Sequence, residues 1–130
     1  MHVVFRLDSS NLIGSGHVMR CVALAQVLRD QGNTVTFICS VLVGHSIEAI
    51  KQAGFAVIEF QGNDSVAWQL DAQDLVSYLS TVDKPDWLIV DHYYLDAAWE
   101  IMVRPYVKRI AVIDDLADRD HDCDLLIDQN

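Results

Sequence analysis

The sequence predicts an α/β protein built on a doubly wound, mostly parallel β-sheet. Short apolar runs alternate along the chain with longer segments whose apolar residues recur at helical spacing. One run, Trp87–Val90, is continuously apolar, which is typical of a central strand covered on both faces. The 130 residues, of which 52% are hydrophobic, suffice for one domain with a core of its own. Together these observations indicate a Rossmann-like arrangement of strands and helices.

In the first half of the chain we expect a strand, a helix, a strand, a helix and a strand, in the order Val3–Leu7, His17–Asp30, Thr34–Cys39, Gly44–Ala53 and Phe55–Phe60. The first helix carries apolar residues every three or four positions, and Gly32-Asn33 ends it. The second strand is rich in β-branched residues. Gly54 is expected to end the second helix, because glycine readily adopts the left-handed conformation found at helix C-termini.

In the second half we expect a helical segment, a strand, a helix and two strands, in the order Val66–Val82, Trp87–Val90, Leu95–Val103, Arg109–Ile113 and Leu125–Ile127. The helical segment is long enough for one helix or two. Asp64 or Ser65 is its expected N-cap, because their side-chain oxygens accept hydrogen bonds from the free N–H groups of a first turn. Pro85 follows at a point where a helix has to have ended.

The composition excludes several classes of partner. Nine Lys and Arg against 19 Asp and Glu give a net charge of −10, which repels nucleic acids and anionic membranes. Three cysteines without zinc or disulfide spacing fit a reduced, cytoplasmic protein. No apolar stretch approaches the roughly 20 residues of a membrane span, and the first apolar run is too short for a signal peptide.

Polar residues directly follow three of the predicted strands. They run from Asp8 to His17 after the first strand, and they are Asp91-His92-Tyr93 and Asp114-Asp115 after two later strands. The carboxyl ends of parallel strands meet at one edge of a sheet, where open α/β folds bind ligands. We therefore expect these residues to gather at one site.

The loop after the first strand contains Gly14-Ser15-Gly16. Met19 stands where the dinucleotide fingerprint requires a third glycine, and the chain has no phosphate loop of the type GxxxxGK[ST]. The small residues would allow the backbone to approach a bound sugar closely. The alternative is a tight turn that packs the first helix on the sheet.

His17 stands where this loop becomes a helix. Free N–H groups and the helix dipole disfavour an imidazolium there, so a neutral ring able to accept a proton is expected. The alternative is a solvated or capping histidine. Arg20 lies three residues further on the same side of the helix, where it could touch a phosphate or a sugar, or pair with an acid such as Asp8.

The remaining candidates have structural alternatives as well. Asp91-His92-Tyr93 could bind substrate or start a helix capped by Asp91, and Asp114-Asp115 could bind sugar hydroxyls and amides or start a turn. No metal and no cofactor is expected, because no further ligands share a recognisable spacing. We interpret His121-Asp122-Cys123-Asp124 as a structural edge segment, because alternate residues of an extended segment face opposite sides.

Several blocks of this sequence resemble the UDP-sugar hydrolases of pseudaminic acid biosynthesis, the UDP-2,4-diacetamido-2,4,6-trideoxy-β-L-altropyranose hydrolase family. They are Asp8-x-Ser10, Ile13-Gly14-x-Gly16-His17-Val18-x-Arg20-Cys21, Asp91-His92-Tyr93, Ile113–Ala117 and His121–Asn130. The blocks occur in the family's order and span almost the whole chain. Related spore-coat polysaccharide biosynthesis proteins are similar at the same motifs.

The resemblance implies a two-domain glycosyltransferase-B-like fold, of which residues 1–130 would be the N-terminal, sugar-facing domain. The nucleotide would be held mainly by a C-terminal domain. The buried strand predicted just before the C-terminus leads us to expect a fragment.

The resemblance also implies a reaction. Water would displace UDP at the anomeric carbon with inversion, His17 would be the general base, and Tyr93 would help to hold the water or His17. Asp8, Gly14, Ser15, Gly16, Arg20, Asp91, His92, Asp114 and Asp115 would bind the substrate. Two alternatives stay open: a glycosyltransferase of the same fold, and a carbohydrate-binding or interaction domain without turnover.

Overall fold

A computed structural model describes residues 1–8, 16–42, 46–61, 67–116 and 118–128. For His17 it describes the backbone alone. In this part of the chain the strands are β1 (His2–Leu7), β2 (Thr34–Ser40), β3 (Ala56–Phe60), β4 (Trp87–Asp91), β5 (Arg109–Ile113) and β6 (Leu125–Ile127). The helices are α1 (Gly16–Asp30), α2 (Ile47–Gln52), α3 (Trp68–Leu79) and α4 (Ala97–Val103), and a 3₁₀ turn, Arg104–Tyr106, continues α4.

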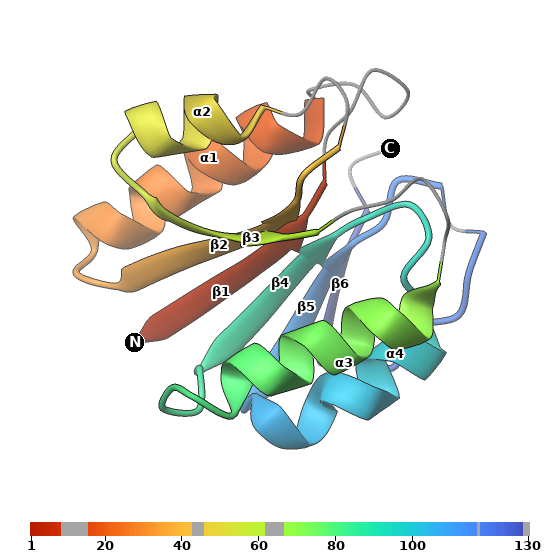
Figure 1. The fold of residues 1–130 in the computed structure, drawn as a ribbon. Helices are drawn as coiled ribbons and strands as arrows, with labels where there is room; N and C mark the ends of the chain where they lie inside the picture. Colours follow the sequence, from red (N-terminus) through yellow and green to blue (C-terminus); the bar gives the residue numbers. More distant parts are fainter. Residues whose placement is uncertain (9–15, 43–45, 62–66, 117, 129–130) are drawn as a thin grey trace.

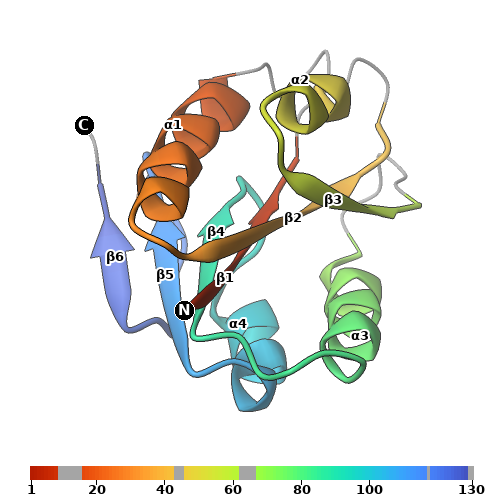
Figure 2. The same ribbon diagram turned by 90° about the vertical axis from the view of Figure 1, so that its left-hand side faces the viewer.

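The strands form one sheet in the order β3-β2-β1-β4-β5-β6, and each pair of neighbours is parallel. Helices α1 and α2 cover one face, and α3 and α4 cover the other (Figures 1 and 2). The chain winds outward from β1 in one direction and from β4 in the other. This arrangement confirms the doubly wound fold and makes the β1/β4 boundary a topological switch point.

Each face of the sheet packs into its own hydrophobic core. On the α1 face, Phe5 stacks on Phe37 with ring centroids 4.8 Å apart, against the buried Cys21 of α1. On the α3 face, Leu88 packs with the fully buried Trp99 of α4. Strand β4 contributes to both cores, as expected for a central strand.

Helices α3 and α4 are shorter than the sequence suggests and α1 begins one residue earlier than predicted, whereas the strands match their predicted ranges closely. Helix α2 is described only from Ile47, and Gly44 lies outside the described residues. The expected N-cap at Asp64 or Ser65 is wrong, because Ala67 holds that position and α3 begins at Trp68. Helix α4 begins at Ala97, two residues later than predicted, because the Asp96 side chain accepts a hydrogen bond from Ala98 N at 3.1 Å and caps it.

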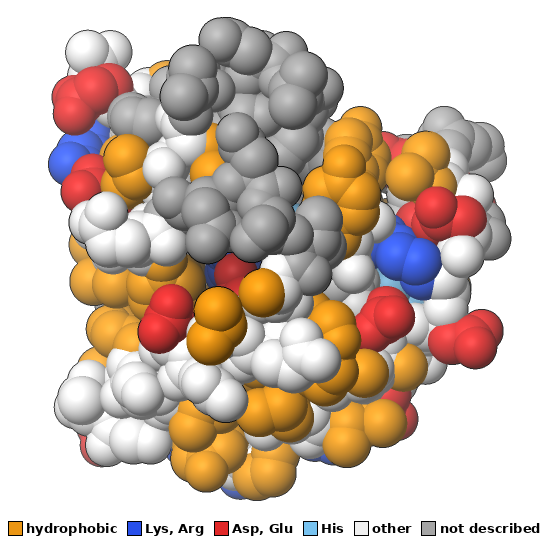
Figure 3. Space-filling view, turned by 45° about the vertical axis from the view of Figure 1, so that its right-hand side comes forward, with side chains coloured by type: hydrophobic (Ala, Val, Ile, Leu, Met, Phe, Trp, Pro, Cys, Tyr) orange, Lys and Arg blue, Asp and Glu red, His pale blue; other side chains and the backbone are white. Residues whose placement is uncertain are grey.

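An apolar groove of about 210 Å³ opens on the α1 face near the amino end of the sheet. Its lining is entirely hydrophobic and comprises Met1, Val3, Leu24, Leu28, Trp87, Ile89, Ala111, Leu125 and Ile127. Hydrophobic side chains also reach the surface in the lower part of Figure 3. The exposed large hydrophobic residues of the described chain include Leu70 of α3 and Ile101 of α4. Within the described ranges, no helix is both long and apolar enough to cross a membrane.

Candidate active site

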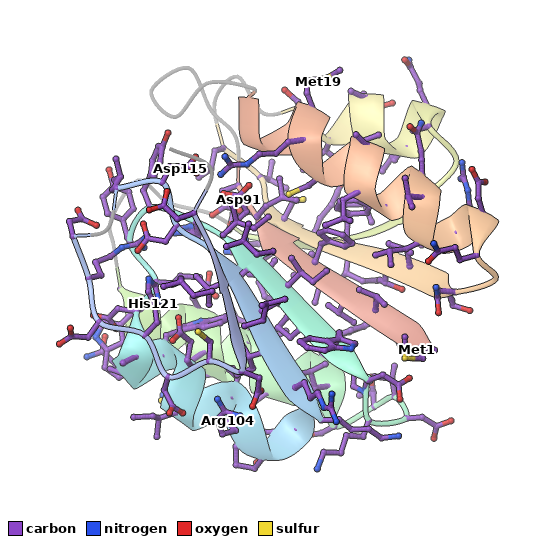
Figure 4. The ribbon with its side chains drawn as sticks, turned by 180° about the vertical axis from the view of Figure 1, so that it is seen from behind. Met1, Met19, Asp91, Arg104, Asp115 and His121 are labelled. Carbon is purple, nitrogen blue, oxygen red and sulfur yellow. The ribbon has the colours of Figure 1, made fainter. Side chains whose placement is uncertain are left out.

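The predicted site residues lie where β1, β4 and β5 end. Register pairs Leu7 with Asp91 and Asp91 with Ile113, so the residues that follow these strands are close neighbours. Figure 4 shows Asp91 and Asp115 at the end of the sheet where α1 begins, with Met1 at the opposite end. The predicted gathering of polar residues at one edge is therefore present in the structure.

Strand alternation divides these residues between the two faces of the sheet. Leu7, Ile89 and Ile113 belong to the core beneath α1, so Asp91, two residues beyond Ile89, also faces α1. Arg6 shares a face with Val4, which packs in the core beneath α3. The site thus consists of two charged networks, one on each side of the sheet edge.

The network on the α3 face is centred on Arg6, which is completely buried. Its Nη1 donates to Asp8 Oδ1 at 2.6 Å, its Nη2 donates to Ser40 Oγ at 3.0 Å, and it also pairs with Asp71 of α3. Burial by itself lowers the pKa of Arg6, but the charges of Asp8 and Asp71 raise it above its ordinary value. Burial likewise raises the pKa of Asp8, but Arg6 outweighs it and holds that pKa well below the ordinary range.

His92 extends this network toward the surface. Its Nε2 lies 2.9 Å from Asp8 Oδ2, and its Nδ1 accepts a hydrogen bond from Tyr94 N at 3.1 Å. Because Nδ1 accepts a hydrogen bond, the ring proton is assigned to Nε2, which donates to Asp8. Both ring nitrogens are occupied, so His92 is held as a rigid side chain and is not placed to act as a general base.

The network on the α1 face joins three elements through one arginine. Arg20 donates through Nε and Nη2 to the two carboxylate oxygens of Asp91, each at 2.7 Å, and through Nη1 to Asp115. The thiol of Cys21 also contacts Asp91, at 3.3 Å. Hydrogen bonding to Asp91 raises the pKa of Arg20, and burial raises the pKa of Cys21. The alternative that Arg20 pairs with nearby acids is confirmed, although its partners are Asp91 and Asp115, whereas Asp8 pairs with Arg6.

Asp114 is enclosed by the connection between β5 and β6. Its carboxylate is buried and bonded to Leu116 N at 3.0 Å, to Arg119 at 3.3 Å and to His121 Nε2 at 2.7 Å. His121 Nδ1 in turn contacts the buried Glu100 at 2.7 Å. These bonds give both Asp114 and His121 structural partners, so a substrate-binding role of Asp114 stays a prediction.

The arginines described near this edge are bonded to carboxylates of the chain itself. Arg6 pairs with two acids, Arg20 pairs with two acids, and Arg119 pairs with Asp114 and Asp118. A diphosphate would have to displace these carboxylates to reach a positive charge. The edge therefore suits the uncharged part of a ligand better than its anionic part.

The glycine loop is described only in part. Gly14 and Ser15 lie outside the described residues, and Gly16 begins α1 in an exposed position. Apart from its chain neighbours and the nearby backbone of its own helix, no described atom lies within 4 Å of the point where a Cβ at Gly16 would stand. Crowding by the described residues therefore does not account for a glycine at this position. The backbone of His17 is in the first turn of α1.

Tyr93 follows β4 in a half-buried position, next to His92. Its assignment beside the attacking water stays a prediction. Among the described residues, no group of three or more His, Cys, Asp or Glu side chains is placed to hold a metal ion.

Sequence reasoning missed three residues of the α3-face network, Ser40, Asp71 and Trp99. Asp71 Oδ1 accepts hydrogen bonds from Arg6 Nε at 3.2 Å and from Trp99 Nε1 at 3.0 Å. The available signal was Arg6 itself, since a charged residue inside an apolar strand needs buried partners. The sequence does not indicate which acid, besides Asp8, is the second partner of Arg6.

Comparison with known proteins gives one informative match. No model of a known protein family matches the sequence. The chain is similar to the UDP-2,4-diacetamido-2,4,6-trideoxy-β-L-altropyranose hydrolase of Campylobacter jejuni, at 28% identity over 134 aligned positions. The alignment covers 100% of this chain and 42% of the relative, so the chain spans less than half the length of the protein it matches.

Proposed function

We propose that this chain is the sugar-facing domain of a UDP-sugar hydrolase. The observation that carries the proposal is the alignment of the whole chain with the C. jejuni hydrolase. Because that relative is longer than this chain, we propose that a second, C-terminal domain holds the nucleotide. The fold and the position of the charged networks at a switch point are compatible with this role.

The charges at the sheet edge support the proposal that this chain binds the sugar and a second domain binds the nucleotide. The described arginines are bonded to carboxylates within the chain, and the whole chain carries a net charge of −10. A doubly charged diphosphate is therefore better accommodated on another domain. The neutral sugar can meet this edge through its hydroxyl and amide groups, which hydrogen-bond with carboxylates and backbone groups.

In the proposed reaction a water molecule attacks the anomeric carbon from the face opposite UDP. A bond forms between the water oxygen and that carbon, the bond from the carbon to the diphosphate oxygen breaks, and UDP leaves with the electron pair. His17 accepts the proton of the water as general base. The free sugar forms with inverted configuration, and Tyr93 helps to hold the water or His17.

The substrate proposed is UDP-2,4-diacetamido-2,4,6-trideoxy-β-L-altropyranose, which is named in the relative's description. The test is to incubate this sugar nucleotide, in water enriched in heavy oxygen, with the protein extended by its proposed second domain. We expect UDP release, heavy oxygen in the sugar and none in the UDP. Label in UDP would mean attack at phosphorus and would contradict the proposal.

The same assay separates the alternatives. A glycosyltransferase would release UDP only when an acceptor is added, and the sugar would appear on the acceptor. A carbohydrate-binding domain would bind the free sugar in a titration but would release no UDP under either condition. Either result would replace the hydrolase proposal.

A further inference from the structure

The first turn of α1 has few described side chains that attach it to the sheet. Gly16 has no side chain and is exposed, and no acidic residue stands in the first turn to interact with the helix dipole. The first described side chains of α1 that reach the sheet are those of Val18, Arg20 and Cys21. Of these, Arg20 forms the charged contacts.

The geometry of these contacts is more specific than an ordinary surface ion pair. A guanidinium is planar, and a bidentate pair with a carboxylate fixes its plane as well as its distance. Arg20 makes such a pair with Asp91 at the end of β4, and the side chain of Asp91 is only 1% exposed. The remaining Nη1 reaches Asp115 after β5. One side chain therefore ties the start of α1 to the ends of two strands.

We propose that Arg20 is a positioning residue, which fixes the first turn of α1, and His17 within it, by bonding Asp91 and Asp115. Residues 17 and 20 are one turn apart on the same side of the helix. A helix start that rotated or frayed would carry residue 17 with it, and an error of about 1 Å in a reacting group can cost roughly 10²-fold in rate. The role of His17 in this argument rests on the proposed hydrolase function.

Charge balance argues against the other role expected for Arg20, a contact with phosphate. One cation faces two carboxylates, so the three groups together already carry a net negative charge. A phosphate that took Arg20 would leave the buried Asp91 without its main counter-ion, which is strongly unfavourable. The sugar nucleotide is therefore not expected to contact Arg20 directly.

The first test measures amide hydrogen exchange on the 130-residue chain and needs no turnover. In Arg20→Gln we expect the amides of the first two turns of α1 to exchange about tenfold faster or more, with the amides of its last turn unchanged. Asp115→Asn, which leaves the Asp91 pair intact, should show a smaller increase. It also serves as the second variant if Arg20→Gln does not fold.

Arg29→Gln is the matched control, because Arg29 lies in the last turn of the same helix. It donates to Ala53 O at 3.0 Å and lies over the Phe55 ring, near the amino end of β3 and away from the carboxyl ends of the strands. We expect it to leave exchange in the first two turns unchanged. Equal exchange in all variants, or an equal effect of Arg29→Gln, would overturn the proposal.

The second test uses the extended enzyme and compares kcat with KM. Arg20→Gln should lower kcat by about 10²-fold with KM and the affinity for UDP nearly unchanged, and Arg20→Lys should recover thermal stability better than kcat. An unchanged kcat would mean a purely structural role, and a raised KM with weakened UDP binding would mean a phosphate contact. If the parent enzyme shows no turnover, the proposed function fails, while hydrogen exchange still decides whether Arg20 fixes α1.

Discussion

Arg6 shows how a single strand residue can shape the interior of a site. It is buried, and its partners come from the end of β1 at Asp8, from β2 and from α3. The network then continues to His92 through Asp8 and to Trp99 through Asp71. Removing the central cation would leave two acids near one another in a region of low polarity.

We therefore predict that Arg6→Met destabilises the protein by about 3–5 kcal/mol, because it leaves the buried Asp8 carboxylate and the partly buried Asp71 carboxylate without their main counter-ion. Urea unfolding followed by circular dichroism would measure the loss. Arg29→Met, at an exposed arginine, should cost less than about 1 kcal/mol. A similar loss in both variants would mean that the Arg6 network adds nothing specific to stability.

His17 carries the second prediction at this scale. In the extended enzyme, His17→Asn should lower kcat by about 10²–10⁴-fold, the usual cost of losing a general base, and leave UDP affinity nearly unchanged. The acidic limb of the rate profile against pH should disappear with it. If the variant kept its kcat and only raised KM, His17 would bind the sugar, and the base would have to be sought at Asp91, Tyr93 or Asp115.

The described residues of the connection from β5 to β6, 114–116 and 118–124, form no helix, and ionic contacts hold them in place. His121 lies between Glu100 of α4 and Asp114. Arg104 binds Asp122 Oδ2 at 2.8 Å and Asp124 Oδ2 at 3.1 Å. These pairs attach the edge strand β6 to the domain.

The titration of His121 should make stability depend on pH. Burial lowers the pKa of His121, but its hydrogen bonds to Glu100 and Asp114 outweigh burial and the repulsion by Arg119, and raise it above 6.5. Because the pKa is higher in the folded state than in the unfolded state, protonated His121 stabilises the protein in full when the pH is below the ordinary value. This stabilisation is lost as the pH rises through the folded pKa. We predict that the urea midpoint falls as the pH rises through the folded pKa of His121.

His121→Gln is the variant that isolates this contribution. Glutamine can still hydrogen-bond to one carboxylate but carries no proton to lose, so the fall of the urea midpoint with rising pH should be smaller. A variant with the parent's slope would show that another group is responsible.

The sequence predicted strands better than helix ends, and the reason is local. Arg109–Ile113 and Leu125–Ile127 were predicted with their observed bounds, because a short apolar run between polar residues is typical of a strand. The expectation that the second of these strands is buried is wrong, because it lies at the edge of the sheet with Leu125 and Leu126 48% and 54% exposed. Helix starts depend on which polar side chain caps the first turn. The choice of Asp96 for α4 and the absence of a side-chain cap at Ala67 do not follow from composition.

The candidate site was predictable as a region but not as a set of contacts. Strand ends in a parallel sheet meet at one edge whatever their side chains, so Asp8, Asp91 and Asp115 could be expected near one another. The partners of Arg20 are 71 and 95 positions away in sequence. Which acids it meets depends on strand order and on the face of each residue, and a single sequence does not specify the order.

At the scale of the whole molecule, we predict that the 130-residue chain alone hydrolyses UDP-sugars slowly or not at all. The proposed base is present, but orientation of the nucleotide is assigned to a second domain, and orientation provides much of a catalyst's advantage. A UDP-release assay on the chain would measure this. Turnover at ~1 s⁻¹ or faster, typical of an ordinary enzyme, would contradict the division between two domains.

The apolar groove supports a separate prediction. Its lining includes Leu125, which is 48% exposed, and apolar surface of this kind favours association. Light scattering over a dilution series should show self-association that Leu125→Lys reduces. Leu70→Lys, at a residue 57% exposed on α3, is the matched control and should have little effect. A chain that is monomeric at every concentration would contradict this prediction.

The internal balance of charge at the sheet edge has a consequence for modularity. Arg6 and Arg20 find counter-ions within residues 1–130, so neither arginine needs one from another domain. In the proposed two-domain arrangement, the half of the site on this chain would be assembled before the second domain docks. Domain exchange should be practicable at this boundary: a nucleotide-binding half with a different base preference could be grafted onto this chain without redesign of its buried ion pairs.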